Sequence, residues 1–208
     1  TYSEYFELFR NKKDLNILEI GIGINDGGGL WGWRKYFENC NNVVGIDILN
    51  CKRYESKEER VHVFVGSQTD TLLLENISNE HGPFDIIIDD GSHKMSDHKV
   101  TFEKLFPLMR DNGLYCIEDL CTAYWSNSDF DAGAQTPQST ITYFNKMVDE
   151  INCRATRQID AGKYRKDPKE PFTYNERHVE SIHFHESLVI VRKREKLYID
   201  KILHSTEY

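Results

Sequence analysis

Apolar residues in the first half of the chain occur in short runs that alternate with amphipathic stretches. Five runs rich in Ile, Val and Leu predict β-strands at residues 16–20, 42–47, 61–65, 84–89 and 113–117. The stretches between them predict helices at residues 30–38, 69–80 and 99–109. Because continuous apolar runs are typical of strands covered on both faces, the rhythm predicts βαβ units and a mainly parallel sheet.

The pattern changes in the second half of the chain. Residues 178–184 and 187–192 alternate between apolar and polar side chains, which predicts a closing antiparallel hairpin. The stretch 121–177, with a predicted helix at 139–151, breaks the rhythm, and we interpret it as an insertion that forms part of a substrate site. The expected fold class is α/β, with a mainly parallel seven-stranded sheet in a single domain spanning residues 1–208.

Composition and charge narrow the possible partners. The chain has 208 residues, of which 39% are hydrophobic and 29% charged, as is ordinary for one globular domain. No run approaches the roughly 18 apolar residues of a membrane span, and no signal-peptide pattern opens the chain, so we expect no membrane partner. The net charge of −8 disfavours nucleic acid. Five cysteines without a Cys-x-x-Cys pair favour reduced thiols and a cytoplasmic location.

A glycine-rich turn follows the first predicted strand. The motif Glu19-x-Gly21-x-Gly23 ends that strand, where glycines let the backbone turn tightly and approach a ligand. The run Gly27-Gly28-Gly29 then leads into a helix whose first amides can bind a carboxylate, which makes Gly28 a further cofactor-binding candidate.

The second predicted strand ends in Asp47, an acid that can accept both hydroxyls of an adenosine ribose. A nicotinamide dinucleotide would suit the same features. Dinucleotide sites, however, have a third glycine where this chain has Asp26, and an acid at Glu19 suits the cationic amine of methionine better than a pyrophosphate. The pattern favours S-adenosylmethionine (SAM) over NAD, while a purely conformational role of the glycines stays open.

The third predicted strand runs into Gly66-Ser67-Gln68-Thr69-Asp70. By its position this loop lies beside the adenine, whose exocyclic amine Gln68 or Asp70 could bind. Thr69 or Asp70 could equally cap the following helix, and both roles can hold.

Acidic residues follow the fourth and fifth predicted strands. The fourth ends in Asp89-Asp90-Gly91-Ser92-His93 and the fifth in Glu118-Asp119. If these strands are neighbours, Asp90, Glu118 and Asp119 meet at the edge where open α/β sheets bind ligands. Carboxylates packed together repel one another unless a cation or protons neutralise them, and oxygen ligands suit Mg²⁺, with Mn²⁺ or Fe²⁺ also tolerated.

A cation at this edge would bind a substrate hydroxyl and lower its pKa. His93 could then remove the proton, since an unperturbed imidazole titrates near neutrality. The alternative is that the acids cap helices or face solvent and that His93 is structural. We interpret His98 as a helix residue.

Together these motifs resemble a known family. The matching segments are residues 18–23, 27–37, 45–48, 82–93, 105–108, 113–120 and 122–125. The chain is similar, over about residues 15–125 and again at 182–185, to the metal-dependent SAM O-methyltransferases that modify macrolide deoxysugars, of the mycinamicin type. The resemblance implies a Rossmann-like class I methyltransferase fold, SAM as methyl donor, a sugar hydroxyl as acceptor and a homo-oligomer.

The resemblance also implies roles for individual residues. A metal would be held by Asp90, Glu118 and Asp119, with His93 and Asp90 as the catalytic residues. The cofactor-binding candidates are Glu19, Gly21, Gly23, Gly28, Asp47, Gln68, Asp70 and Asp89.

Two departures from the family pattern concern the ligands. Gly27-Gly28-Gly29 stands where the family usually has Gly-Gly-Ser, so a hydroxyl contact to the SAM carboxylate is missing or replaced by backbone amides. The region after Trp125 does not obviously match, so the acceptor need not be a macrolide. Its basic stretch 154–169 could bind the phosphates of a nucleotide-linked sugar, or be a solvated loop.

The sequence therefore predicts a SAM- and metal-dependent O-methyltransferase that acts on a sugar hydroxyl. The alternatives are an NAD-linked sugar oxidoreductase, a non-catalytic SAM-binding protein and, within the first class, an N-methyltransferase.

Overall fold

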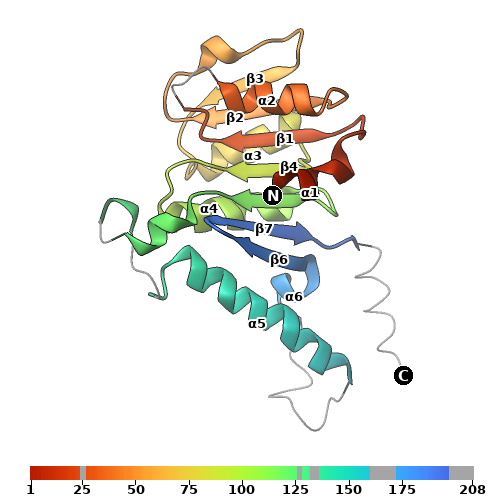
Figure 1. Cartoon of the computed structure of the whole chain (residues 1–208), viewed down its shortest axis with the longest axis vertical. Coiled ribbons are helices and arrows are strands. Elements are labelled where there is room, and N and C mark those ends of the chain that lie inside the picture. Colours follow the sequence, from red (N-terminus) through yellow and green to blue (C-terminus); the bar gives the residue numbers. More distant parts are fainter. Residues whose placement is uncertain (24–26, 126–127, 132–135, 160–171, 197–208) are drawn as a thin grey trace.

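The computed structural model of the chain describes residues 1–23, 27–125, 128–131, 136–159 and 172–196. Asp26, most of the basic stretch 154–169, and the side chains of 153–159 lie outside this description. One seven-stranded sheet organises the fold, with strand order β3-β2-β1-β4-β5-β7-β6 (Figure 1). The strands are β1 (Asn16–Ile20), β2 (Asn42–Asp47), β3 (Val61–Val65), β4 (Ile86–Asp89), β5 (Leu114–Ile117), β6 (Val179–His185) and β7 (Leu188–Lys193).

Strands β1 to β5 are mutually parallel, and the hairpin β6–β7 joins β5 antiparallel. This is the mainly parallel sheet with a closing hairpin that the sequence predicts. The first three strands have the predicted bounds, and β4 and β5 begin slightly later than predicted. The hairpin turn lies one residue later than predicted, because Ser187 takes the positive φ of 59° that tight hairpin loops require.

Helices cover both faces of the sheet. The helices are α1 (Tyr2–Phe6), α2 (Gly28–Tyr36), α3 (Thr71–His81), α4 (Met95–Leu105), α5 (Thr140–Ile159) and α6 (Tyr174–His178), with single turns η1 (Glu7–Phe9), η2 (Lys52–Tyr54), η3 (Phe106–Leu108), η4 (Leu120–Tyr124) and η5 (Ser128–Phe130). One core layer packs α1 and α2 against the sheet, and the other packs α3, α4 and α5 against its opposite face (Figure 1).

Helix positions agree less closely with the prediction than strand positions do. The helix predicted at 99–109 is α4, which begins at Met95 and gives way to η3 after Leu105, because Pro107 lacks the amide hydrogen that an α-helix needs. The helix predicted at 139–151 continues to Ile159, and the sequence pattern does not predict α1 or α6. Among the described residues, no helix is both long and apolar enough to cross a membrane.

Candidate active site

The loops that follow β1, β2, β3 and β4 line a cavity of about 430 Å³ at the carboxyl edge of the sheet. Three of the predicted cofactor-binding residues, Gly21, Asp47 and Gln68, lie in its wall. Ile48 and Leu49 extend the wall with apolar side chains that are 72% and 46% exposed. A pocket with apolar walls and a few polar groups at the strand ends is suited to a nucleoside ligand.

Gly21 brings the first loop against the fourth. Its φ of +89° is unfavourable for other residues, and a β-carbon there would lie 2.0 Å from the carbonyl oxygen of Asp90. The glycine turn and the acidic loop after β4 are therefore in direct backbone contact, which links the cavity to the predicted metal site.

Asp47 holds the glycine turn in place. Its Oδ2 accepts hydrogen bonds from the amides of Ile22, at 2.8 Å, and Gly23, at 2.9 Å, while Oδ1 accepts one from Leu49 at 2.8 Å. A carboxylate has about four lone-pair positions, so Asp47 retains capacity for a ribose hydroxyl.

In the loop that follows β3, the polar atoms of Gln68 bind other groups of the protein. The amide nitrogen of Gln68 donates to Asp89 at 3.1 Å and to Thr101 at 3.2 Å, and its oxygen accepts the amide of Ser92 at 2.7 Å. Asp89 is fully buried, also accepts the Tyr115 hydroxyl at 3.2 Å, and has a pKa raised by burial to about 7. Gln68 therefore joins the loop after β3 to the end of β4 and to the loop that follows it.

Asp70 is the N-cap of α3. Its carboxylate accepts the backbone amides of Leu72 and Leu73. This confirms the capping role that the sequence left open for this residue. Gly28 is the first residue of α2, next to its N-cap Gly27.

Glu19 lies buried between β1 and α2. Its Oε1 accepts the indole nitrogen of Trp33 at 3.2 Å, and a β-carbon at Gly29 would lie 2.0 Å from that oxygen, so α2 approaches this closely only with glycine. Burial, reinforced by the charges of Asp90 and Glu118, raises the pKa of Glu19 to about 8. Its Oε2 has no hydrogen-bond partner among the described residues, and a buried acceptor in that state fits an added donor such as a ligand amine.

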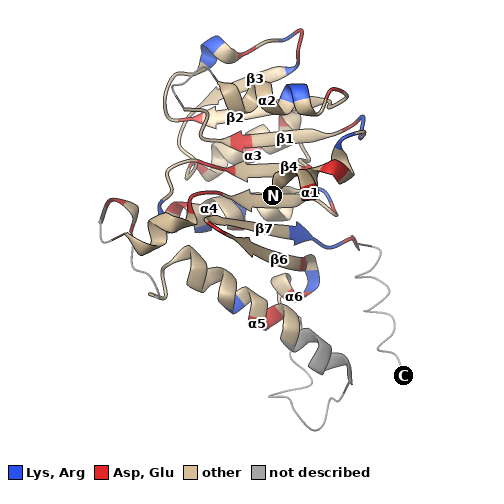
Figure 2. Ribbon diagram, in the orientation of Figure 1, with Lys and Arg blue, Asp and Glu red and all other residues tan. Residues whose placement is uncertain are grey.

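The acidic residues after β4 and β5 converge as the sequence predicts. The two strands pair in parallel with Asp89 opposite Ile117, so Asp90 and Glu118 follow at the same edge. In Figure 2 the ribbon is coloured red, for Asp and Glu, where these strands end. We call Asp90, Glu118 and Asp119 the acidic cluster.

His93 joins the acidic cluster. One ligand atom each from Asp90, His93 and Asp119 lies within 4.8 Å of the others, and His93 Nε2 is 3.7 Å from Asp119 Oδ2. Both His93, at φ 54°, and Asp119, at φ 52°, adopt left-handed backbone conformations, which are uncommon for residues other than glycine. Thr122 fixes the two segments together by donating its hydroxyl to the backbone oxygens of His93 and Asp119.

Glu118 stands slightly apart from this group. Its Oε1 accepts the hydroxyl of Tyr2 at 2.6 Å, and the pKa of that phenol is raised by burial and by nearby acidic groups, so it stays a donor. No sequence pattern groups Tyr2 with the site, because 116 residues separate it from Glu118. Only the packing of α1 over the sheet brings them together.

The cluster carries unbalanced negative charge. Burial raises the pKa of Asp90 to about 7, and the charges of Glu118 and Asp119 add to the effect. None of the ion pairs among the described residues brings a lysine or arginine to these acids. The carboxylates of Asp90 and Asp119 meet at one point, and Glu118 lies near Asp90. Carboxylate oxygens are the ligands that a hard divalent cation prefers, so the residues present fit the metal that the sequence predicts.

Relatives of the chain are enzymes that methylate sugars. It is 37% identical over 201 residues to the 8-demethyl-8-alpha-L-rhamnosyl tetracenomycin-C 2'-O-methyltransferase of Streptomyces olivaceus, a match that covers 93% of this chain and 49% of that protein. It is 32% identical over 200 residues to the mycinamicin VI 2''-O-methyltransferase of Micromonospora griseorubida, covering 92% of this chain and 47% of the relative. No protein-family model matches the chain.

Comparison of the fold with solved structures points to the same group of methyltransferases. The structure superposes on MycE methyltransferase from the mycinamycin biosynthetic pathway, solved in complex with Mg and SAH, with a TM-score of 0.81 and 30% identity over 93% of this chain and 49% of that one. The chain thus spans about half the length of the relatives it matches. By sequence and by its Rossmann-like methyltransferase fold, it belongs to the family of sugar O-methyltransferases that includes these tetracenomycin and mycinamicin enzymes.

Proposed function

We propose that this chain carries the catalytic site of a SAM-dependent, divalent-metal-dependent O-methyltransferase that acts on a sugar hydroxyl. The observation that carries the proposal is the acidic cluster with His93, at the tips of two adjacent strands and in backbone contact with the cavity wall through Gly21. The sugar acceptor is carried over from the tetracenomycin and mycinamicin relatives.

The proposed SAM-binding residues lie in and beside the cavity. SAM supplies a methyl group already activated by its sulfonium. Asp47, which holds the glycine turn of Gly21 and Gly23, accepts the ribose hydroxyls, and the apolar walls of Ile48 and Leu49 enclose the adenosine. The unpartnered Oε2 of Glu19 accepts the methionine amine.

Among the remaining candidates, Gly28 presents the first amides of α2 to the methionine carboxylate. Gln68, Asp89 and Asp70 act on the cofactor indirectly, by fixing the loop that forms the adenine wall, because their polar atoms bind protein groups.

The acceptor side follows from the acidic cluster. Asp90, Glu118 and Asp119 would hold a divalent cation, which supplies the positive charge that lowers the pKa of an acceptor hydroxyl. His93 Nε2 accepts the proton of that hydroxyl, and the nearby Asp119 Oδ2 stabilises the imidazolium that results. Positioning and deprotonation are the main demands on the protein, because the methyl group is already activated.

Binding and turnover test this proposal together. Isothermal titration with S-adenosylhomocysteine (SAH) and with NAD separates the methyltransferase from the NAD-linked oxidoreductase, since we expect only SAH to bind. Methyl transfer from labelled SAM to rhamnosylated and macrolide acceptors is then measured before and after EDTA treatment and on restoring Mg²⁺. NAD binding without SAH binding, or full turnover after verified metal removal, would contradict the proposal.

Assembly and location are parts of the same proposal. We propose a homo-oligomer acting in the cytoplasm on a small sugar-containing substrate, without a nucleic-acid or membrane partner. Light scattering of the purified chain tests the assembly, and a single-chain mass would contradict it.

A further inference from the structure

The N-terminal helix reaches the acidic cluster through one side chain. Tyr2 in α1 donates its hydroxyl to Glu118 Oε1 at 2.6 Å. Its ring is stacked on Phe6, with 4.7 Å between ring centroids, and meets the ring of Trp33 edge-on at 5.7 Å. The hydroxyl is therefore held in place by a packed aromatic surface.

Trp33 makes the corresponding contact on the cofactor side. Its indole nitrogen donates to Glu19 Oε1 at 3.2 Å, and its ring packs edge-on against Phe6 at 5.5 Å. Tyr2, Phe6 and Trp33 thus touch one another, and we call them the aromatic triad. The triad carries two hydrogen-bond donors, and each binds a carboxylate of the proposed site.

Both hydrogen-bond donors of the aromatic triad are uncharged. Tyr2 and Trp33 are neutral, so each fixes the orientation of a carboxyl group without adding a positive charge beside it. The buried acid Asp85, which lies at the other end of β4, is instead paired with the positively charged Lys12 and Arg110. Each neutral donor also occupies only Oε1 of its acid, and Oε2 of Glu19 has no partner among the described residues.

We propose that Tyr2 and Trp33 are positioning residues: Tyr2 orients Glu118 toward the divalent cation, and Trp33 orients Glu19 toward the methionine amine of SAM. The inference rests on the proposed function, because it assigns the two acids to those ligands. It adds that α1, which precedes the first strand, completes the site.

Two substitutions separate the two halves of the inference. Tyr2→Phe keeps the ring and removes the hydroxyl, so Mn²⁺ affinity should fall about tenfold or more, as is usual when a hydrogen bond to a metal-binding side chain is lost. Trp33→Phe removes the donor to Glu19, so SAH affinity should fall about tenfold, with a smaller change in Mn²⁺ affinity. Mn²⁺ binding is measured from the electron paramagnetic resonance signal of the free ion, and SAH binding by calorimetry.

Helix α2 supplies matched controls for both substitutions. Tyr36→Phe removes a hydroxyl that donates to Glu7 at 3.3 Å on the surface, and Trp31→Phe changes a part-exposed indole of α2. Both variants should keep both affinities within about twofold of wild type, as is usual for surface changes.

The outcomes distinguish the inference from the proposed function. If the wild-type chain binds Mn²⁺ and SAH but Tyr2→Phe binds Mn²⁺ equally well, Tyr2 has no positioning role. If Tyr2→Phe lowers the affinities for Mn²⁺ and SAH equally and also lowers the melting temperature, the role of Tyr2 is merely structural and the inference is overturned. A wild-type chain that binds no Mn²⁺ would overturn the proposed metal site itself.

Discussion

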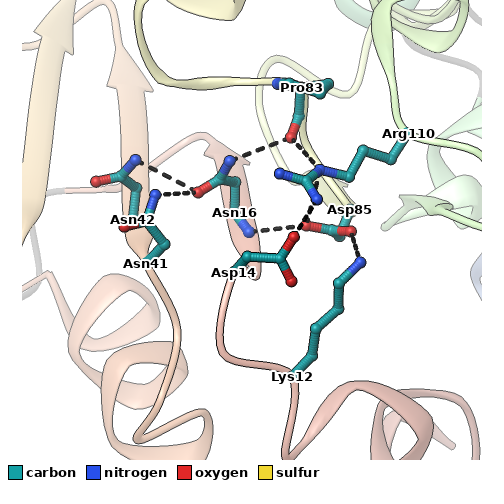
Figure 3. A network of polar contacts seen from close by, with 8 residues as sticks. All are labelled: Lys12, Asp14, Asn16, Asn41, Asn42, Pro83, Asp85 and Arg110. Atoms are coloured by element: carbon teal, nitrogen blue, oxygen red, sulfur yellow. Dashed lines mark hydrogen bonds and ion pairs between the residues drawn. The ribbon is translucent and has the colours of Figure 1, made fainter.

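Strand β4 has a buried acid just before its start and a part-buried acid just after its end, and the two acids have different charged neighbours. Asp85 precedes the strand and is 1% exposed. It accepts Lys12 Nζ at 2.6 Å and the amide of Asn16 at 2.9 Å, and Arg110 Nε lies 3.7 Å away (Figure 3). Asp90, just beyond the other end, lies among Glu118 and Asp119, and no Lys or Arg forms a described ion pair with it.

The difference separates an acid whose charge the fold compensates from the acids that we propose bind a cation. A buried carboxylate with two cations and a backbone donor has its desolvation compensated within the chain. The amides around Asn16 extend that network to Asn41, Asn42 and Pro83 (Figure 3). Among the described residues, no lysine or arginine pairs with Asp90 at the carboxyl edge. Burial, together with the charges of Glu118 and Asp119, raises the pKa of Asp90 to about 7, and such shifts are typical of functional sites.

The largest expected effect comes from Asp90→Asn. Removing one proposed metal-binding carboxylate should lower Mn²⁺ affinity and methyl transfer by roughly a thousandfold, since a bound cation contributes several kcal/mol to such chemistry. The metal-free melting temperature should not fall, because the change relieves repulsion within the cluster. Unchanged Mn²⁺ affinity in this variant would show that Asp90 is not kept for a cation.

Asp85→Asn should show the opposite behaviour. It leaves Lys12 and Arg110 without their buried partner, so the free energy of unfolding should fall by about 3 kcal/mol, with Mn²⁺ affinity unchanged. Denaturant unfolding at neutral pH measures this. The control Asp14→Asn removes an acid that is also paired with Arg110 but is exposed, and it should cost less than about 1 kcal/mol. Equal losses for both variants would remove the special role of Asp85.

His98 shows a third way of keeping a buried ionisable group, which is to hold it neutral. Its Nδ1 is 3.1 Å from Thr140 Oγ1, its Nε2 has no partner among the described residues, and burial, with the charge of His93, lowers its pKa to about 3. Below about pH 6.5 the unfolded chain takes up a proton that the folded chain does not, so stability falls as the pH is lowered.

The size of this effect can be measured against a variant that cannot titrate. Between pH 7 and pH 5 the wild type should lose about 2 kcal/mol relative to His98→Asn, which keeps a polar group near Thr140. Denaturant unfolding at each pH gives the difference, and parallel pH profiles of the two proteins would contradict it.

The smallest expected effect concerns Asp70, an acid at the carboxyl edge of the sheet. Its negative charge is stabilised by hydrogen bonds from backbone amides. Asp70→Ala should lower the free energy of unfolding by about 1 kcal/mol, and Asp70→Ser should restore most of it, because serine also caps helices. SAH affinity should be unchanged in Asp70→Ser, because serine keeps the cap that fixes the loop. A loss of SAH affinity in Asp70→Ser would instead favour the adenine contact that the sequence also allowed.

Much of the site could be predicted because strand ends are recognisable from local sequence. Apolar runs indicate the strands, and parallel neighbours bring the residues after them to one edge, which is why Asp90, Glu118 and Asp119 could be grouped. The roles of Gln68 and Asp89 could not be resolved in this way. Both line up with the cofactor loops in the sequence, but only packing shows that their polar atoms face each other.

The contacts of the N-terminal segment were also beyond sequence patterns. Tyr2 to Glu118 and Lys12 to Asp85 join residues 116 and 73 positions apart, and nothing in the local sequence around them marks a partner. Such pairs form because α1 and the chain after it pack across the sheet.

The succession of strands along the chain, the glycine turn and the acids at the strand tips can all be read from the amino-acid sequence, because hydrophobic periodicity and backbone preferences act over a few residues. Which of those acids have their charge compensated within the chain, and which do not, is settled only when the chain is folded. That outcome depends on burial and on cations and donors brought in from distant segments, and neither is encoded near the acid itself.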